Sequence, residues 1–65
     1  MWRVVYMAQN KESALKLEKF LNRDGILAKI RPISRNNLHK DSYYEVLVTE
    51  SEVEEAHSVI IEKGY

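Results

Sequence analysis

The chain has 65 residues, no cysteine, ten basic and ten acidic residues, and a formal net charge of zero. This length predicts a single domain over residues 1–65, near the lower size at which one core holds a fold. The missing cysteine excludes disulfides, thiolate metal sites and thiol nucleophiles, and it is compatible with a reducing cytoplasm. No apolar run approaches the roughly 20 residues of a membrane span, and the first residues do not resemble a signal peptide, so we expect a soluble cytoplasmic protein.

The charges are divided unevenly along the chain. Residues 1–40 carry nine Lys or Arg and three acids, whereas residues 41–65 carry one Lys and seven acids, so the net charges are +6 and −6. This asymmetry is compatible with ion pairs inside the fold, with association between copies, or with a basic patch for an anionic partner. For so small a chain we favour charge matching within the fold or within a dimer.

The first expected element is a strand over residues 2–8, in which successive side chains fall on opposite faces. Unbroken alternation places Trp2, Val4, Tyr6 and Ala8 on one face and Arg3, Val5 and Met7 on the other. Both faces of this strand therefore carry side chains that can pack.

A helix is predicted to follow, with Asn10 as its N-cap and Lys11 near its first turn. Leu15 projects away from the apolar stripe of this helix, so it is either exposed or in contact with another chain. Gly25 ends the helix, because glycine readily adopts the left-handed conformation of the last turn. The stripe itself consists of Ala14, Leu17 and Leu21, with Phe20 at its margin.

A second strand is expected over residues 26–33, and Pro32 favours an edge position for it because proline has no backbone donor. The following residues, 34–41, are polar and rich in turn formers, which predicts a loop. We regard this loop as a possible contact for a ligand or a partner, through Arg35, Asn36, Asn37, His39 and Lys40.

Residues 43–49 give the clearest strand signal in the chain, since β-branched and aromatic residues dominate them. Alternation places Tyr44, Val46 and Val48 on one face and Tyr43, Glu45, Leu47 and Thr49 on the other.

The last expected element is a helix that begins with a capping box between Ser51 and Glu54. Gly64 closes this helix, and Tyr65 is left over beyond it. The side chains expected to face inward are Val53, Ala56, His57 and Ile60.

The element order β-α-β-β-α predicts an α+β fold. A right-handed crossover places the third strand between the other two and antiparallel to both, with two helices on one face. This arrangement is a ferredoxin-like plait lacking the last strand, and it leaves the other sheet face and the first strand's edge without a cover. The expected interface on that face consists of Val5, Met7, Leu27 and Leu47 at its centre, with Tyr43, Arg3 and Arg31.

Catalysis is the function class that the sequence supports least. A two-layer chain of this size has little depth for a water-poor cleft, and its two glycines are helix terminators rather than parts of a phosphate loop. His39 and His57 lack a third ligand for zinc, so we interpret both as structural. We therefore predict no catalytic residue, no metal site and no cofactor.

Single-stranded RNA is another candidate partner, because sheets of this topology can stack bases on exposed aromatic side chains. Tyr43, Arg3, Lys29 and Arg31 could share the open sheet face. The paired-aromatic signature of such proteins is missing, and the acids of the second part oppose a polyanion, which argues against nucleic acid. A homo-oligomeric interaction module fits better, and the alternative is a modest exposed patch on a monomer.

The chain resembles the short prokaryotic signal-transducing proteins whose fold is related to the PII regulators. The resemblance covers nearly the whole chain apart from residues 34–41, and it involves the residues that form the strands and helices rather than catalytic positions. Its points are residues 5–10, Ala14, Leu17, Leu21, Gly25, Ile26, residues 44–48, Glu55 and Ala56. It implies a regulatory module and carries over no functional residue.

Some very short proteins that look like this one carry a glutamate decarboxylase label. The sequence argues against that activity, because a pyridoxal-phosphate enzyme needs a buried Schiff-base lysine and a phosphate cradle. None of the six lysines lies in an apolar context. We expect a non-enzymatic module that binds to itself and to a protein or a small ligand; the alternative is a PII-like sensor with its pocket between chains.

Overall fold

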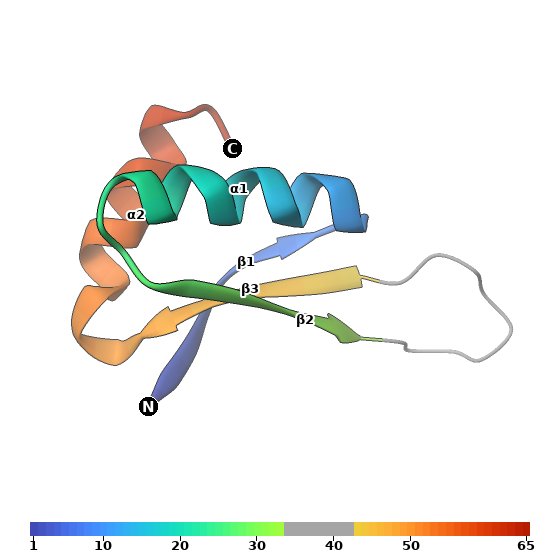
Figure 1. Cartoon of the computed structure of the whole chain (residues 1–65), viewed down its shortest axis with the longest axis horizontal. Coiled ribbons are helices and arrows are strands. Elements are labelled where there is room, and N and C mark those ends of the chain that lie inside the picture. The colour runs from blue at the N-terminus through green and yellow to red at the C-terminus, as the bar shows by residue number, and fades with distance from the viewer. Residues whose placement is uncertain (34–42) are drawn as a thin grey trace, which may run out of the picture.

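The computed structural model of the chain describes residues 1–33 and 43–65. Figure 1 shows the elements in chain order. They are strand β1 (Trp2–Ala8), helix α1 (Lys11–Arg23), strand β2 (Ala28–Ile33), strand β3 (Tyr43–Thr49), the short 3₁₀ helix η1 (Glu50–Glu52) and helix α2 (Val53–Glu62). The loop predicted at 34–41 lies outside the described residues.

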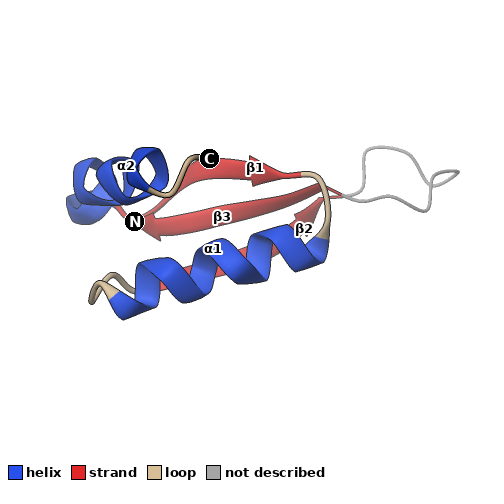
Figure 2. Cartoon of the chain, turned by 90° about the horizontal axis from the view of Figure 1, so that it is seen from above, coloured by secondary structure: helices blue, strands red, loops and turns tan. Residues whose placement is uncertain are grey.

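The three strands form an antiparallel sheet in the order β1-β3-β2. Both helices lie on one face of this sheet, with α1 over β2 and β3 and with α2 at the end where β1 begins (Figure 2). The expected α+β class, with a three-stranded antiparallel sheet and two helices, is confirmed. Because β3 is the central strand, β1 and β2 form the edges of the sheet.

The core lies between the sheet and the helices, and the alternation of β3 explains how it forms. Val46 and Val48 point toward the helices and are fully buried against Leu17 and Leu21 of α1. The stripe predicted for α1 is therefore confirmed, and Leu15 on the other side of that helix is exposed, as expected.

Helix α1 begins and ends with the caps that its sequence predicts. The Asn10 side-chain oxygen accepts a hydrogen bond of 2.8 Å from the Ser13 backbone N–H, which satisfies one free donor of the first turn. At the other end Gly25 has a φ of 82°, and the Ile26 N–H donates back to the Leu21 carbonyl at 3.0 Å. This Schellman motif places buried Ile26 directly in the core.

The capping box predicted for α2 is wrong. The Glu50 N–H donates to the Met1 carbonyl at 2.8 Å, and the chain then forms η1, so that α2 begins only at Val53. Ser51 lies within η1, where its hydroxyl is 3.5 Å from that of Thr49. The side chain of Glu52, the residue before α2, makes no capping hydrogen bond to the first turn of that helix.

Two further expectations for the last part of the chain need correction. His57 is exposed rather than inward, and Val59 takes the buried position beside Ala56. Tyr65 is not left over: its ring packs edge-on against Tyr6 at 5.4 Å and against Phe20 at 6.5 Å between ring centroids. The last residue therefore joins β1 to α1.

The alternation predicted for β1 is broken by a β-bulge at Val5. Val4 lies opposite Leu47, whereas Tyr6 lies opposite Val46, so Val5 is an extra residue in the strand. Because of the bulge, the side chains before Val5 lie on the opposite faces from those that unbroken alternation predicts. Trp2 and Val4 consequently lie on the face without helices, in contrast to the expectation.

The observed cap at Asn10 can be compared directly with the predicted one at Ser51. Replacing Asn10→Ala should lower the free energy of unfolding by about 1 kcal/mol, because a first-turn N–H loses its acceptor. Replacing Ser51→Ala should change it by less than about 0.5 kcal/mol. Urea denaturation of both variants measures this. Equal losses would restore the capping box at Ser51, and Asn10→Asp should retain the stability of the original chain.

A second stability measurement concerns the last residue. Tyr65→Ala should lower the free energy of unfolding by about 2 kcal/mol, because the half-buried ring loses apolar contact and two aromatic neighbours. Exposed Leu15→Ala on α1 is the matched control and should stay within about 0.5 kcal/mol. A Tyr65→Ala protein as stable as its control would mean that the ring contributes nothing.

Candidate interaction surface

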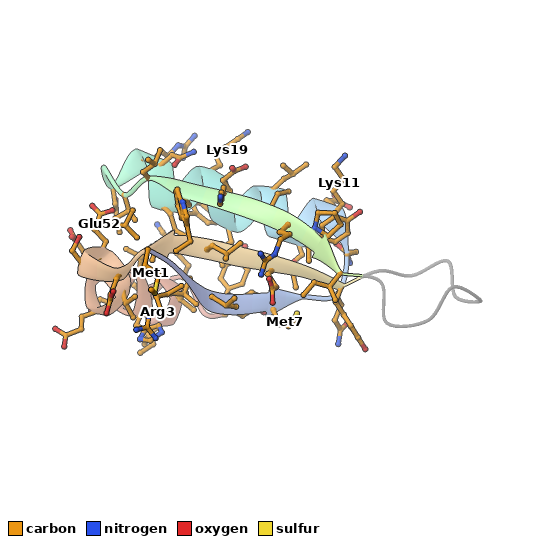
Figure 3. The ribbon with its side chains drawn as sticks, turned by 90° about the horizontal axis from the view of Figure 1, so that it is seen from below. Met1, Arg3, Met7, Lys11, Lys19 and Glu52 are labelled. Atoms are coloured by element: carbon orange, nitrogen blue, oxygen red, sulfur yellow. The ribbon has the colours of Figure 1, made fainter. Side chains whose placement is uncertain are left out.

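The sheet face opposite the helices, which we call the open face, is built from alternate residues of all three strands (Figure 3). The pairing register determines its members. They are Trp2, Val4 and Met7 of β1, Lys29, Arg31 and Ile33 of β2, and Tyr43, Glu45, Leu47 and Thr49 of β3.

The open face is divided into an apolar side and a charged side. Along β1, Trp2, Val4 and Met7 are 37%, 45% and 48% exposed, and together they form what we call the β1 patch. Along β2, Lys29 and Arg31 are exposed and basic. Because the two edge strands differ in this way, the apolar surface available to a partner is concentrated beside the edge of β1.

Leu47 lies at the centre of the open face and is only 3% exposed, although no helix covers it. Its cross-strand neighbours are Val4 and Lys29. The Lys29 Nζ lies 4.3 Å from the centroid of the Trp2 ring, so the lysine side chain extends across β3 to the other edge strand. The exposed apolar side chains of the open face are therefore those of the β1 patch and Tyr43, not Leu47.

The charges of the open face are partly neutralised within it. The Arg31 Nε and Nη2 atoms donate to one Glu45 carboxylate oxygen at 2.9 and 2.5 Å. Glu45 is well shielded from water, and its guanidinium partner is exposed. A second ion pair, outside the open face, joins Arg3 to Glu50 at 3.1 Å. Each of these pairs links the basic first part of the sequence to the acidic second part.

Two residues of the expected interface lie elsewhere because of the bulge. Arg3 lies opposite Val48 on the helix side of the sheet, where it pairs with Glu50, and Val5 packs against the core. The expected positions of both on the open face are therefore wrong. Trp2 and Val4 take their places. The sequence contains no signal for this exchange, because residues 4–8 can all pack and none of them marks the solvent side of the strand.

The remaining residues of the expected interface are placed as follows. Met7, Tyr43, Leu47 and Arg31 lie on the open face, and Leu27 is exposed just before β2 begins. The predicted loop contacts lie outside the described residues; they are Arg35, Asn36, Asn37, His39 and Lys40.

The described surface also has shallow hollows. One of about 520 Å³ lies beside the Arg3 and Glu50 pair, between the start of β1 and α2, and another of about 270 Å³ lies beside Phe20 and Tyr65. Within residues 1–33 and 43–65, no group of three or more His, Asp or Glu side chains is arranged to hold a metal ion. No helix in the described part of the chain is long and apolar enough to cross a membrane.

No protein-family model, no curated protein and no solved structure matches this chain.

The contact between Lys29 and Trp2 can be tested by fluorescence, because Trp2 is the single tryptophan. Lys29→Ala should increase quenching of Trp2 emission by acrylamide, since the lysine stem no longer covers the ring. It should also lower the free energy of unfolding by up to about 1 kcal/mol. Lys19→Ala, which removes the same charge from α1, should leave the quenching unchanged. Equal quenching in all three proteins would show that Lys29 does not cover Trp2 in solution.

Proposed function

We propose that this chain is a non-enzymatic interaction module of the cytoplasm that acts by binding through its β1 patch, first to a second copy of itself. The single observation that carries the proposal is the exposure of Val4 and Met7 on one face of an edge strand. Exposed apolar side chains that are contiguous, unlike scattered ones, favour association because burial removes them from water.

The charged groups beside the patch support binding rather than catalysis. Glu45 is the carboxylate of the open face, and Arg31 donates two hydrogen bonds to it. Both donors of the guanidinium are directed at one oxygen of this carboxylate, so the contact is charge-assisted and holds the Glu45 side chain in place. An ion pair at the rim of an apolar patch instead contributes to the orientation of a partner.

The same contacts disfavour RNA as the partner. Trp2 and Tyr43 are exposed aromatic side chains that could stack on bases. However, the cation of Lys29 lies over the Trp2 ring, and Arg31 is neutralised by Glu45. A polyanion would have to displace both contacts, and it gains little from a chain with zero net charge.

Two finer expectations belong to this proposal. The strand order β1-β3-β2 with a helix between β1 and β2 supports a ferredoxin-like plait lacking its last strand. The resemblance to the short signal-transducing proteins supports a regulatory role. A small-ligand sensor with a pocket between chains is the alternative function, and it requires association of two copies as its first step.

Association should be visible in the solution mass. Light scattering from about 1 µM to about 1 mM should give a mass that rises from that of one chain, 7.7 kDa, toward that of two. Met7→Asp should lower the affinity at least about tenfold, because it places a charge in the buried contact. Leu15→Asp is the matched control, since Leu15 is 43% exposed on α1, and it should leave the mass unchanged.

Two outcomes would contradict the proposal. A mass of one chain at every concentration would mean that the protein does not bind to itself. Association that Met7→Asp leaves intact would place the interface away from the β1 patch.

A further inference from the structure

The two edges of the sheet are protected to different extents. An edge strand presents unpaired N–H and C=O groups, and proteins commonly guard it with proline, charges or a bulge. β2 contains Pro32, which has no N–H to donate, between two residues of the open face, and it also carries Lys29 and Arg31. Antiparallel pairing of two β2 strands about Ile30 would place Lys29 against Arg31 of the other copy, and like charges opposite each other are destabilising.

The edge of β1 has fewer of these protections than that of β2, although it contains the bulge at Val5. The strand has seven residues and no proline, and its one charge, Arg3, lies on the helix side beside Glu50. In the described part of the chain, no strand pairs with the outer edge of β1. Figure 2 shows that α2 lies at the end where β1 begins, whereas the other end of β1 extends beyond that helix.

The bulge gives β1 a symmetric pattern of faces. The helix side holds Arg3, Val5, Tyr6 and Ala8, and the open side holds Val4 and Met7. The pattern is symmetric about the peptide bond between Val5 and Tyr6. In either direction from that bond, the first side chain lies on the helix side, the second on the open side and the third on the helix side. A second β1 strand that runs antiparallel about this bond therefore meets the first with every side chain from Arg3 to Ala8 on a matching face. A regularly alternating strand would have its symmetry centre on a residue instead.

From this symmetry we infer that two copies of the chain pair antiparallel through β1 and form one six-stranded sheet. Val4 of each copy lies opposite Met7 of the other on the open face. The two β1 patches then become one continuous apolar strip that runs along the paired strands, across the two-fold axis. The inference deepens the proposed function and rests on its claim that the protein binds to itself.

The other pairs in this register also fit. Tyr6 lies opposite Val5 of the second copy, and Arg3 lies opposite Ala8, so no two like charges meet across the strands. The contact is isologous, because the same surface serves both copies, and it closes at a dimer. The protected edges of β2 become the two outer edges of the six-stranded sheet.

Disulfide cross-linking measures this register, because the chain has no cysteine of its own. Residues directly opposite each other in an antiparallel pair have Cα atoms about 4.5–5.5 Å apart, within the range of a disulfide. Val4 of one copy and Val4 of the other would be offset by three residues, about 10 Å along the strand. Mild oxidation of a mixture of Val4→Cys and Met7→Cys proteins should therefore give the mixed disulfide as the main cross-linked product.

The controls use the same oxidation, and mass spectrometry identifies the cross-linked products. Val4→Cys alone and Met7→Cys alone should give little cross-linked dimer, and Leu15→Cys should give none with either. A dimer by light scattering in which the Val4→Cys and Met7→Cys mixture does not cross-link would overturn edge pairing and leave the proposed function standing. Efficient cross-linking of Val4→Cys to itself would overturn the register. A protein that remains a single chain at every concentration would overturn both the inference and the self-binding that it rests on.

Discussion

The extra residue at Val5 is the constraint on which the surface of this molecule depends. In a strand with unbroken alternation, Trp2 and Val4 would point into the helix layer and Val5 would lie on the open face. With it, Val5 and Tyr6 both contribute to the core, and the exposed apolar side chains gather along one edge strand. One additional residue in β1 thus decides both how the core is filled and where a partner can bind.

The core shows how a chain of 65 residues compensates for its size. Both helices end in the same Schellman motif, with φ values of 82° at Gly25 and 83° at Gly64. In each motif the residue after glycine is apolar and returns to the core: Ile26 under α1, and Tyr65 between β1 and α1. Loops that bury a side chain directly after a helix add apolar contact without lengthening the chain.

Much of the fold could be predicted because local chemistry determines it. The apolar stripe of α1, the cap at Asn10 and the turn at Gly25 depend on neighbours within a few residues, and all are confirmed. The errors arise where distant residues compete. Met1 takes the N–H of Glu50, which displaces the cap expected at Ser51, and Tyr6 with Phe20 provides a site for Tyr65. The bulge depends on the register with β3, which no local pattern encodes.

Alternation along each strand predicts which residues form the open face, and this prediction is correct for β2 and β3 but not for β1. The faces of β2 and β3 follow the expectation, so Arg31, Tyr43 and Leu47 lie where they were placed. On β1 the error exchanged Arg3 and Val5 for Trp2 and Val4. This exchange changes the chemistry of the surface, because a basic residue leaves and an aromatic and an aliphatic one arrive. β1 itself therefore contributes no cation to the open face, the Lys29 ammonium that reaches it lies over the Trp2 ring, and the apolar side chains of β1 favour another apolar strand edge.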